Sequence, residues 1–440
     1  MPEIRPCRAL RFNPATIADP ALVVAPPYDV IDEAQRRRLL ARHPANVVRL
    51  DLPGIEQGDE QDDRYRRAAR TLAAWRSDGT LHKDPHPSIY VYEQSYRVPG
   101  SEVSRVQRGF LARLRLEAFG PGSGVLPHER TLAGPREDRY RLLRATGVNT
   151  SPVVALYDDL DETGRPVLDA VMARRADVDL NDEDGVCHRL WGVPADGDHV
   201  AEVAPLLTAA GHHPVTIADG HHRYETALRY RDERRMSRSC EEDPPFDYIL
   251  ALLLEASRQQ LTVLPTHRVL RGLGEGGVAV LHARLDELFA VRRGVGSAEL
   301  CEVFESIALS PGGAGRFGLW TRSGGMLLSA RRAAFEPFLP PGGSAVRQLD
   351  VTLLGVALER LVGITTDAVA GGAVTYSKSA VDAIALVDDV NDGADAVFLL
   401  EPTPVAAISA VARDGDVMPQ KSTYFYPKAL TGLVINPHEQ

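Results

Sequence analysis

The densest group of reactive side chains in this 440-residue chain is the sequence Asp-Gly-His-His-Arg-Tyr-Glu at positions 219–225. An apolar run rich in β-branched residues, 214–218, precedes it, and a helical pattern follows it. At a strand-to-helix turn the first main-chain N–H groups of the helix have no partner, and the helix dipole favours negative charge there. We therefore expect this turn to bind an anion, above all a phosphate group.

The side chains of the turn fit that chemistry. Gly220 permits a tight turn and the close approach of a ligand. Arg223, in the first turn of the helix expected from His221, can hold a phosphate through two parallel hydrogen bonds. His221 can contribute to the same phosphate, and both His221 and His222 are candidates for proton transfer.

Two carboxylates flank these basic residues. Asp219 stands near the N-cap position, where it can accept main-chain N–H groups, and Glu225 shares a helix face with His221. Asp219 and Glu225 can instead hold a Mg²⁺ ion that accompanies the phosphates of a nucleotide. Two further interpretations stay open. One is a capped surface helix without a ligand, and the other is a permanent metal site at Asp219, His221 and Glu225, for which the spacing is not specific.

Three other segments carry residues that can complete a phosphate site. After a glycine-rich junction, Glu129 can act as a general base toward a substrate hydroxyl, and Arg130 can act as a phosphate ligand. His267 and Arg268 follow an apolar strand, which is a usual position for site residues in α/β folds. Lys421, near the C-terminus, can reach a phosphate or a carboxylate. Each segment also has a structural interpretation, as a loop held by local contacts.

A rigid turn with two prolines, Pro26-Pro27-Tyr28-Asp29, is a further candidate. Asp29 can cap the helix expected from Ile31. Alternatively, Tyr28 or Asp29 can line the site, and both interpretations are open at this point.

The composition is that of an ordinary globular protein. The net charge of −10 argues against broad binding to nucleic acids or membrane surfaces, which requires a basic face. No apolar run is long enough to span a membrane, and the N-terminus has no apolar signal core, so we expect a cytoplasmic protein. The four cysteines, Cys7, Cys187, Cys240 and Cys301, are scattered, which indicates free thiols rather than a zinc site or disulfides.

A chain of this length is too long for one core, and its elements predict a multi-domain fold of the mixed α/β (α+β) class. We expect an N-terminal α/β domain at residues 1–120. A central domain at 121–275 would carry the reactive turn, and a C-terminal α/β domain would follow at 276–440.

Two local patterns make more specific predictions. Residues 88–97 and 106–117 alternate like strands and predict a hairpin around Pro99-Gly100. The apolar segment 246–256 fits a buried helix or a buried strand, and pattern alone does not decide between them.

Five motifs, spread over nearly the whole chain, resemble those of the bacterial and archaeal family known as domain of unknown function 1015. They are Ala-Pro-Pro-Tyr-Asp-Val-Ile at 25–31, His-Glu-Arg-Thr at 128–131, Ile-Ala-Asp-Gly-His-His-Arg-Tyr-Glu-Thr-Ala at 217–227, Leu-Pro-Thr-His-Arg at 264–268 and Met-Pro-Gln-Lys-Ser-Thr-Tyr-Phe-Tyr-Pro-Lys at 418–428. The family implies no settled activity, so the reaction has to be inferred from the residues.

A more distant resemblance concerns the turn alone. With Gly220 and Arg223 it is similar to the phosphate-binding turn of the ParB/sulfiredoxin-like superfamily, whose members use CTP or ATP. This resemblance implies a ParB/sulfiredoxin-like strand-turn-helix element in the middle of the chain and a nucleotide ligand. It also implies a glutamate base of the kind that free serine kinases use, for which Glu129 is the candidate.

We therefore expect a nucleotide-dependent phosphotransferase that acts on a small hydroxylated metabolite, with serine or phosphoserine as candidates. ATP or another nucleotide with Mg²⁺ would be the cofactor, the partners would be small molecules, and an oligomer is left open. The alternatives are a ParB-like switch that binds CTP or ATP and a phosphatase that uses the same groups. A scaffold without a ligand fits the reactive turn least, and the acidic charge argues against a DNA-binding protein.

Overall fold

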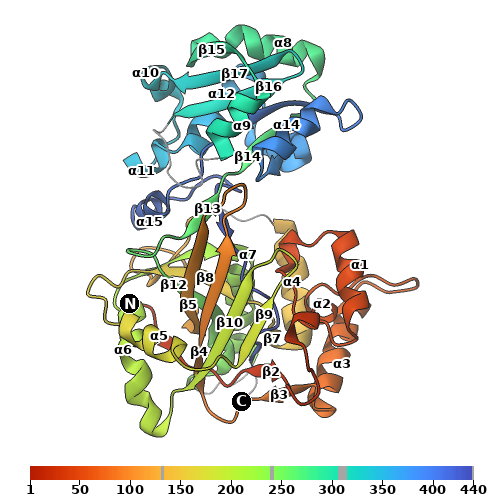
Figure 1. Cartoon of the computed structure of the whole chain (residues 1–440), viewed down its shortest axis with the longest axis vertical. Helices are drawn as coiled ribbons and strands as arrows, with labels where there is room; N and C mark the ends of the chain where they lie inside the picture. Colours follow the sequence, from red (N-terminus) through yellow and green to blue (C-terminus); the bar gives the residue numbers. More distant parts are fainter. Residues whose placement is uncertain (130–132, 238–241, 306–314, 439–440) are drawn as a thin grey trace.

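The structure of the chain is a computed structural model that describes residues 1–129, 133–237, 242–305 and 315–438. The described residues form two bodies stacked along the long axis of the molecule (Figure 1). The first body comprises residues 1–264 and the C-terminal segment 415–438, and the second body comprises residues 265–414. The predicted multi-domain fold of the mixed α/β class is confirmed.

Within the described residues, a nine-stranded sheet forms the centre of the first body, in the order β6-β11-β8-β12-β5-β4-β10-β9 with β1 paired to β5. Its strands are β1 (Ile4–Arg5), β4 (Ser88–Arg97), β5 (Ser104–Arg115), β6 (Val125–Leu126), β8 (Val153–Tyr157), β9 (Val178–Asn181), β10 (Cys187–Pro194), β11 (Val215–Asp219) and β12 (Tyr248–Glu255). The predicted hairpin is confirmed as β4 and β5, joined through Gly100 with a φ of +72°. The ambiguous apolar segment is the strand β12, whose buried position between β5 and β8 explains its continuous apolar run.

The two faces of this sheet are covered by different parts of the chain. Successive residues of β4, such as Ile89 and Tyr90, alternate between two separate cores, as the pleat of a strand requires. The core that contains Ile89 is closed by a layer of helices, namely α4 (Ala133–Thr146), α5 (Arg165–Met172), α6 (Val200–Gly211) and α7 (His221–Ser237). The core that contains Tyr90 is closed in part by the C-terminal segment, including Phe425 and Leu430.

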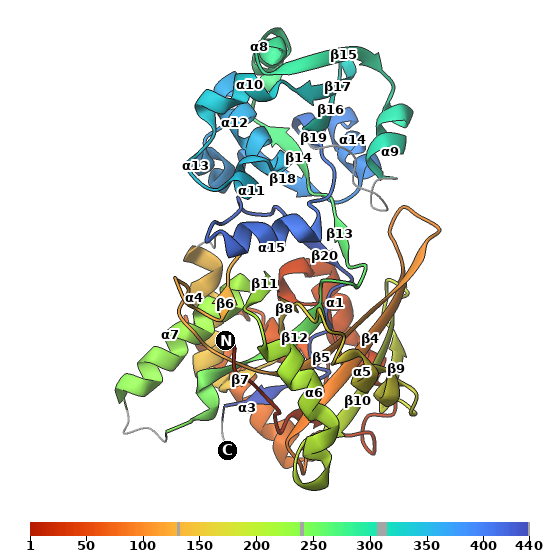
Figure 2. The same cartoon turned by 90° about the vertical axis from the view of Figure 1, so that its left-hand side faces the viewer.

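Shorter elements complete the first body beside α4. They are β2 (Leu10–Phe12), β3 (Leu81–Lys83), α1 (Glu33–Arg42), α2 (Val48–Asp51) and α3 (Asp63–Ser77). Helix α3 packs against α4, and β2 pairs with β3. Tyr28 and Asp29 act electrostatically on Arg223 of α7, so the Pro26–Asp29 turn lies near the start of that helix. Figure 2 shows α1, which follows the turn, in the half of the first body that is nearer to the second body.

In the described part of the second body, six antiparallel strands form one sheet in the order β15-β17-β16-β19-β14-β18. They are β14 (His267–Arg271), β15 (Phe289–Val295), β16 (Arg316–Thr321), β17 (Gly324–Ala330), β18 (Val374–Ser377) and β19 (Ala394–Leu399). Helices α8 (Gly274–Arg284) and α12 (Asp350–Val362) share a core with one face of the sheet, and α9 (Ser297–Glu305) and α14 (Ala380–Asp388) share a core with the other. Three short helices, α10 (Arg332–Phe335), α11 (Ser344–Arg347) and α13 (Thr366–Ala368), fill the remaining turns.

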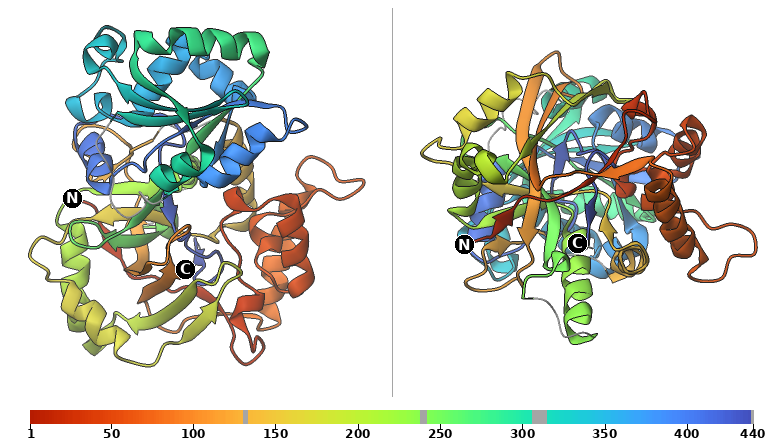
Figure 3. Two further views of the ribbon diagram at one scale, coloured as in Figure 1. Left: turned by 45° about the horizontal axis from the view of Figure 1, so that its top comes forward. Right: turned by 90° about the horizontal axis from the view of Figure 1, so that it is seen from below.

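Two passages of the chain connect the bodies. Strand β13 (Thr262–Leu264) leads into the second body, and the chain returns after α15 (Val405–Arg413). On its return it forms β20 (Tyr424–Tyr426), which pairs with β13, and β21 (Asn436–Pro437), which pairs with β7 (Val148–Asn149). The blue C-terminal segment therefore lies inside the first body (Figure 3).

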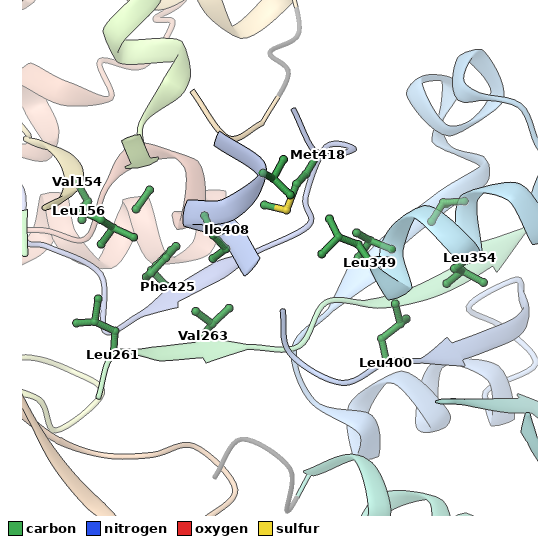
Figure 4. Close-up of a cluster of buried hydrophobic side chains, with 14 of the residues drawn as sticks. Val154, Leu156, Leu261, Val263, Leu349, Leu354, Leu400, Ile408, Met418 and Phe425 are labelled. Atoms are coloured by element: carbon green, nitrogen blue, oxygen red, sulfur yellow. The ribbon is translucent and has the colours of Figure 1, made fainter. Parts of the chain in front are cut away.

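One apolar cluster continues across the junction of the two bodies (Figure 4). It runs from Val154 on β8, through Phe425 and Ile408, to Leu349 and Leu354 in the second body. The bodies are thus packed on a shared core and are not joined by a free tether.

The predicted domain boundary at residue 120 falls within the nine-stranded sheet, because β4 and β5 pair directly with strands from 121–275. Division of the chain into three separately folding units stays a prediction. In the part of the chain that the structure describes, no helix combines the length and apolar character needed to cross a membrane.

Candidate active site

The reactive turn joins β11 to α7. A bulge between Ile217 and Asp219 shifts the register of β11 against β8, and α7 begins at His221 as predicted. Gly220 has a φ of +87°, and a Cβ atom there would lie 2.9 Å from Nε of Arg223. The turn therefore requires glycine for both its backbone conformation and its close contact.

The start of α7 offers unpaired hydrogen-bond donors. The first main-chain bond of the helix joins the N–H of Tyr224 to the carbonyl of Gly220 at 3.0 Å. Among the described residues, no main-chain acceptor faces the main-chain N–H groups of His221 and Arg223. These donors and the dipole of a 17-residue helix make the turn suitable for an anion.

Asp219 anchors the turn through two ion pairs. Its carboxylate accepts from Nη2 of Arg223 at 2.7 Å and from Nζ of Lys428 at 2.6 Å. Burial by itself raises the pKa of Asp219, but Lys428 and Arg223 outweigh burial and hold that pKa well below its usual range. Asp219 therefore stays ionised as a partner of cations and does not cap α7.

Arg223 is held inside the first body. Besides Asp219, its guanidinium donates to Oγ of Ser151 at 3.2 Å and to the carbonyl of Pro152. Most of its donors are therefore used within the protein. This arrangement fits a residue that positions the turn better than one that clamps a phosphate with both donors.

His128 and His221 form a buried pair. Nδ1 of His128 donates to the carbonyl of Ile217 at 2.5 Å, so its Nε2 accepts from the hydroxyl of Thr423 at 3.0 Å. The main-chain N–H of His128 donates to Nε2 of His221 at 3.2 Å. Burial lowers the pKa of His128 to about 4 and the pKa of His221 well below its usual value, so both rings are neutral near pH 7. His221 therefore holds the 128–129 loop, and its Nε2 is occupied.

His222 is the histidine that faces the site. It is partly buried, and burial followed by the nearby ammonium of Lys421 lowers its pKa, while Glu225 and Asp29 oppose that change. The ring of His222 therefore lies near Lys421, Glu225 and Asp29. His222 thus remains a candidate for proton transfer.

Glu129 lies next to the C-terminal segment, where its main chain forms an isolated parallel β-bridge with Met418. Burial raises the pKa of Glu129 to about 7, although the main-chain N–H and the ammonium of Lys421 lower it. A carboxyl group with such a pKa exists in both protonation states near neutrality, which suits a general base. The predicted neighbour Arg130 lies outside the described residues.

Arg268 supports the main chain beside Glu129. Its guanidinium donates to Oγ1 of Thr266 at 2.7 Å and to the carbonyl of Lys421 at 3.3 Å. Within the described residues it has no carboxylate within 4.0 Å, and burial lowers its pKa to about 10. Glu129 acts electrostatically on this buried cation, so the two groups lie close together.

His267 is separate from these residues. It is fully buried in the second body, where its Nδ1 accepts from the main-chain N–H of Leu400 at 3.1 Å, and burial lowers its pKa to about 3. We therefore leave it out of the proposed site, and its predicted role in phosphate binding stays untested.

Sequence reasoning missed two lysines that complete the site. Of the 50 lysines and arginines in the chain, only four are lysines: Lys83, Lys378, Lys421 and Lys428. Nζ of Lys378 lies 3.7 Å and Nζ of Lys428 lies 4.3 Å from the ring centre of Tyr424. The scarcity of lysine in an arginine-rich chain is the signal that could have identified them.

The Pro26–Asp29 turn also faces this region. The N-cap of α1 is Asp32, whose Oδ1 accepts from the main-chain N–H of Gln35 at 2.7 Å, so Asp29 does not cap the helix. Asp29 is exposed, and it acts electrostatically on His222 and Lys378. Its second interpretation, as a residue that lines the site, agrees with this position.

The carboxylates predicted for Mg²⁺ do not fit that role as they are arranged. Both oxygens of Asp219 are paired with cations, and Oε2 of Glu225 lies 2.7 Å from Nη1 of Arg136. Across the described residues, no group of three His, Cys, Asp or Glu side chains could hold a metal ion. This arrangement does not support a Mg²⁺ ion at Asp219 and Glu225, and that site stays a prediction.

A separate pocket of about 340 Å³ lies away from the turn, at the ends of β8 and β12. Tyr157 and Glu255 line it, whereas Asp219 pairs with Val154 nearer the start of β8. Its charged lining is paired internally, for example Arg258 with Glu162 at 3.1 Å. None of the predicted site residues lines this pocket.

Fold and site together define a two-body α/β protein in which a glycine-containing strand-to-helix turn lies near a partly buried glutamate, Glu129. The family model described as protein of unknown function (DUF1015) matches residues 4–352, so the chain belongs to this family. No curated protein matches the sequence.

Several solved structures resemble parts of the chain. A conserved hypothetical protein from Pyrococcus furiosus is 14% identical with a TM-score of 0.34, covering 69% of this chain and 87% of its own. A free serine kinase in complex with AMP is 14% identical with a TM-score of 0.35, covering 69% and 83%. SbnI with a C-terminal truncation, from Staphylococcus aureus, is 10% identical with a TM-score of 0.36, covering 74% and 87%. At TM-scores below 0.5 these similarities carry no conclusion about function.

Proposed function

We propose that this protein is a nucleotide-dependent phosphotransferase that acts on a small hydroxylated metabolite, with serine and phosphoserine among the first candidates. The observation that carries the proposal is the position of Glu129, a carboxyl group with a pKa near 7, beside Lys421 and near Asp219 at the start of α7, where the main-chain N–H groups of His221 and Arg223 point outward. Phosphoryl transfer needs little more than positioning, charge neutralisation and a base for the acceptor hydroxyl.

The roles follow from what each group can donate or accept. The N–H groups at the start of α7 and the ammonium of Lys421 bind phosphate oxygens of the nucleotide. The Glu129 carboxylate accepts the proton of the acceptor hydroxyl, a new P–O bond forms to that oxygen, and the P–O bond to the leaving nucleotide breaks. Arg223 and Asp219 keep the turn in place, and no step is assigned to a metal ion held by the protein.

The contacts of Arg268 support this assignment. It holds the carbonyl of Lys421, whose own main-chain N–H acts on Glu129. The base and a phosphate ligand are thus fixed by the same short segment. A change in Arg268 is expected to disturb both.

The experiment is a product assay on the full chain. ATP, ADP, CTP and GTP are each incubated with Mg²⁺ and a panel of hydroxylated acceptors, including serine, and phosphorylated products are detected by ³¹P NMR. We expect transfer to one acceptor class, lowered about 100-fold or more in Glu129→Gln. Glu299→Gln, an exposed glutamate on α9 of the second body, is the matched control.

Other outcomes identify the alternatives. Tight nucleotide binding without any product contradicts the phosphotransferase and favours the regulatory switch. Release of phosphate from a phosphorylated metabolite, with the same dependence on Glu129, favours the phosphatase, because water then takes the place of the acceptor hydroxyl.

A further inference from the structure

Three of the four lysines in the chain come together although they lie on different segments. Lys378 lies between β18 and α14 in the second body, and Lys421 and Lys428 lie on the C-terminal segment of the first body. Lys378 and Lys428 both contact the ring of Tyr424. Both Lys421 and Lys428 lie close enough to lower the pKa of Lys378.

The cluster carries positive charge that the protein does not neutralise. Lys428 is paired with Asp219, but within the described residues Lys378 and Lys421 have no carboxylate within 4.0 Å. Two exposed carboxylates, Asp29 and Asp184, face Lys378 at longer range. Repulsion among neighbouring ammonium groups is unfavourable, and a bound anion would relieve it.

The backbone around Lys421 is held in an unusual conformation. Lys421 has a φ of +55°, in the left-handed region that side chains other than glycine adopt rarely. Its carbonyl accepts from Arg268 and from the hydroxyl of Thr266 at 2.8 Å. Surrounding contacts thus keep a strained residue in place, which is a frequent property of functional sites.

We propose that Lys378, Lys421 and Lys428 form one anion site, built across the two bodies, that binds the polyphosphate chain of a nucleotide. The ligand rests on the proposed function, but the site predicts binding without any turnover. A polyphosphate fits better than a single carboxylate because it carries several charges, and the site offers three ammonium groups. Lys428 also pairs with the residue next to Gly220, so the lysines continue the anion-binding surface of α7.

The position of Lys378 gives the second body a part in the site. Its ammonium reaches the first body at Tyr424, beside the hydrogen bonds that Thr266 and Arg268 of the second body donate to the carbonyl of Lys421. A bound polyphosphate would therefore bridge the bodies and stabilise their junction. Ligand that binds only the folded state raises the midpoint of unfolding.

The test is calorimetric titration of the full chain with inorganic triphosphate near neutral pH. Lys378→Gln, Lys421→Gln and Lys428→Gln should each weaken binding about tenfold or more, because each removes a charge-assisted contact. Lys378→Arg should retain most of the affinity. Lys83→Gln, at the fourth lysine on β3, is the matched control and should bind like the wild type. Circular dichroism and thermal unfolding establish that each variant is folded.

The outcomes separate this site from the proposed reaction. If folded Lys378→Gln binds triphosphate as tightly as the wild type, or if the lysines affect only a carboxylate-bearing acceptor, the cross-body polyphosphate site is wrong. If binding depends on the lysines but no phosphoryl transfer is found, the site stands and the phosphotransferase is contradicted. If phosphoryl transfer is found but triphosphate binding does not depend on the lysines, the phosphotransferase stands and the polyphosphate site is wrong.

Discussion

Asparagine in place of Asp219 tests whether the ion-pair network holds the reactive turn. The substitution keeps the size of the side chain but removes the charge that faces Arg223 at 2.7 Å and Lys428 at 2.6 Å. The side chains of Asp219, Lys428 and Arg223 are only 16%, 12% and 11% exposed, so water compensates for little of the lost charge. Removal of one partner from a buried pair costs about 3–5 kcal/mol. We expect a loss near the lower end, about 3 kcal/mol, because the amide oxygen can still accept one hydrogen bond.

The assay is urea unfolding followed by tryptophan fluorescence. Trp75 and Trp191 lie in the first body and Trp320 in the second, so a Trp320→Phe background reports on the first body alone. Asp161→Asn, at an exposed aspartate, is the control and should change the free energy of unfolding by less than about 0.5 kcal/mol. A change below about 1 kcal/mol for Asp219→Asn would refute the view that this network holds the turn.

The same variant has a defined pH dependence. The folded-state pKa of Asp219 lies below that of the unfolded chain, because Lys428 and Arg223 outweigh the effect of burial. Its contribution is therefore present above about pH 4, the unfolded value, and is lost as the pH falls further. The difference in stability between wild type and variant should shrink as the solution is acidified, and a constant difference would contradict the assignment.

The remaining predictions concern the site itself. Because burial raises the pKa of Glu129 to about 7, the rate of phosphoryl transfer should rise as the pH rises through about 7. The Glu129→Gln variant should abolish this rise. A rise that persists in the variant would exclude Glu129 as the base. Gly220→Ala should destabilise the protein by about 1–2 kcal/mol and weaken triphosphate binding, measured by unfolding and calorimetry, because of the positive φ and the contact with Arg223. Since burial lowers the pKa of Lys378 to about 8, triphosphate affinity should fall above that pH in the wild type and persist in Lys378→Arg; equal loss in both would contradict the role of its charge.

Much of the local structure could be predicted because its causes are local. Alternation in residues 88–97 and the glycine at 100 specify the hairpin of β4 and β5, and helix α7 begins at His221, directly after the predicted turn at Asp219 and Gly220. The apolar segment that became β12 was undecided, since burial on both faces removes the alternation that identifies a strand. Its neighbours β5 and β8 decided that question.

The site was predicted in part. Glu129, Lys421 and Arg268 lie together near the turn, a convergence that the sequence left open, whereas His267 is buried in the second body. Asp29 was left between two roles, and Asp32 took the capping position. Which of two nearby aspartates caps a helix depends on the residue at which the helix begins in the folded chain. A short motif does not specify that residue.

Residue types and their spacing along the chain were sufficient to predict the geometry of the turn, because a strand end, a glycine and a helix start are set by neighbouring residues. The roles of Arg223 and Lys428, and the arrival of Lys378 from the second body, depended on the tertiary structure. Ion pairs between residues about 200 positions apart, such as Lys428 with Asp219, form only when packing brings the segments together. Burial then sets which charges are paired and which remain available for a ligand.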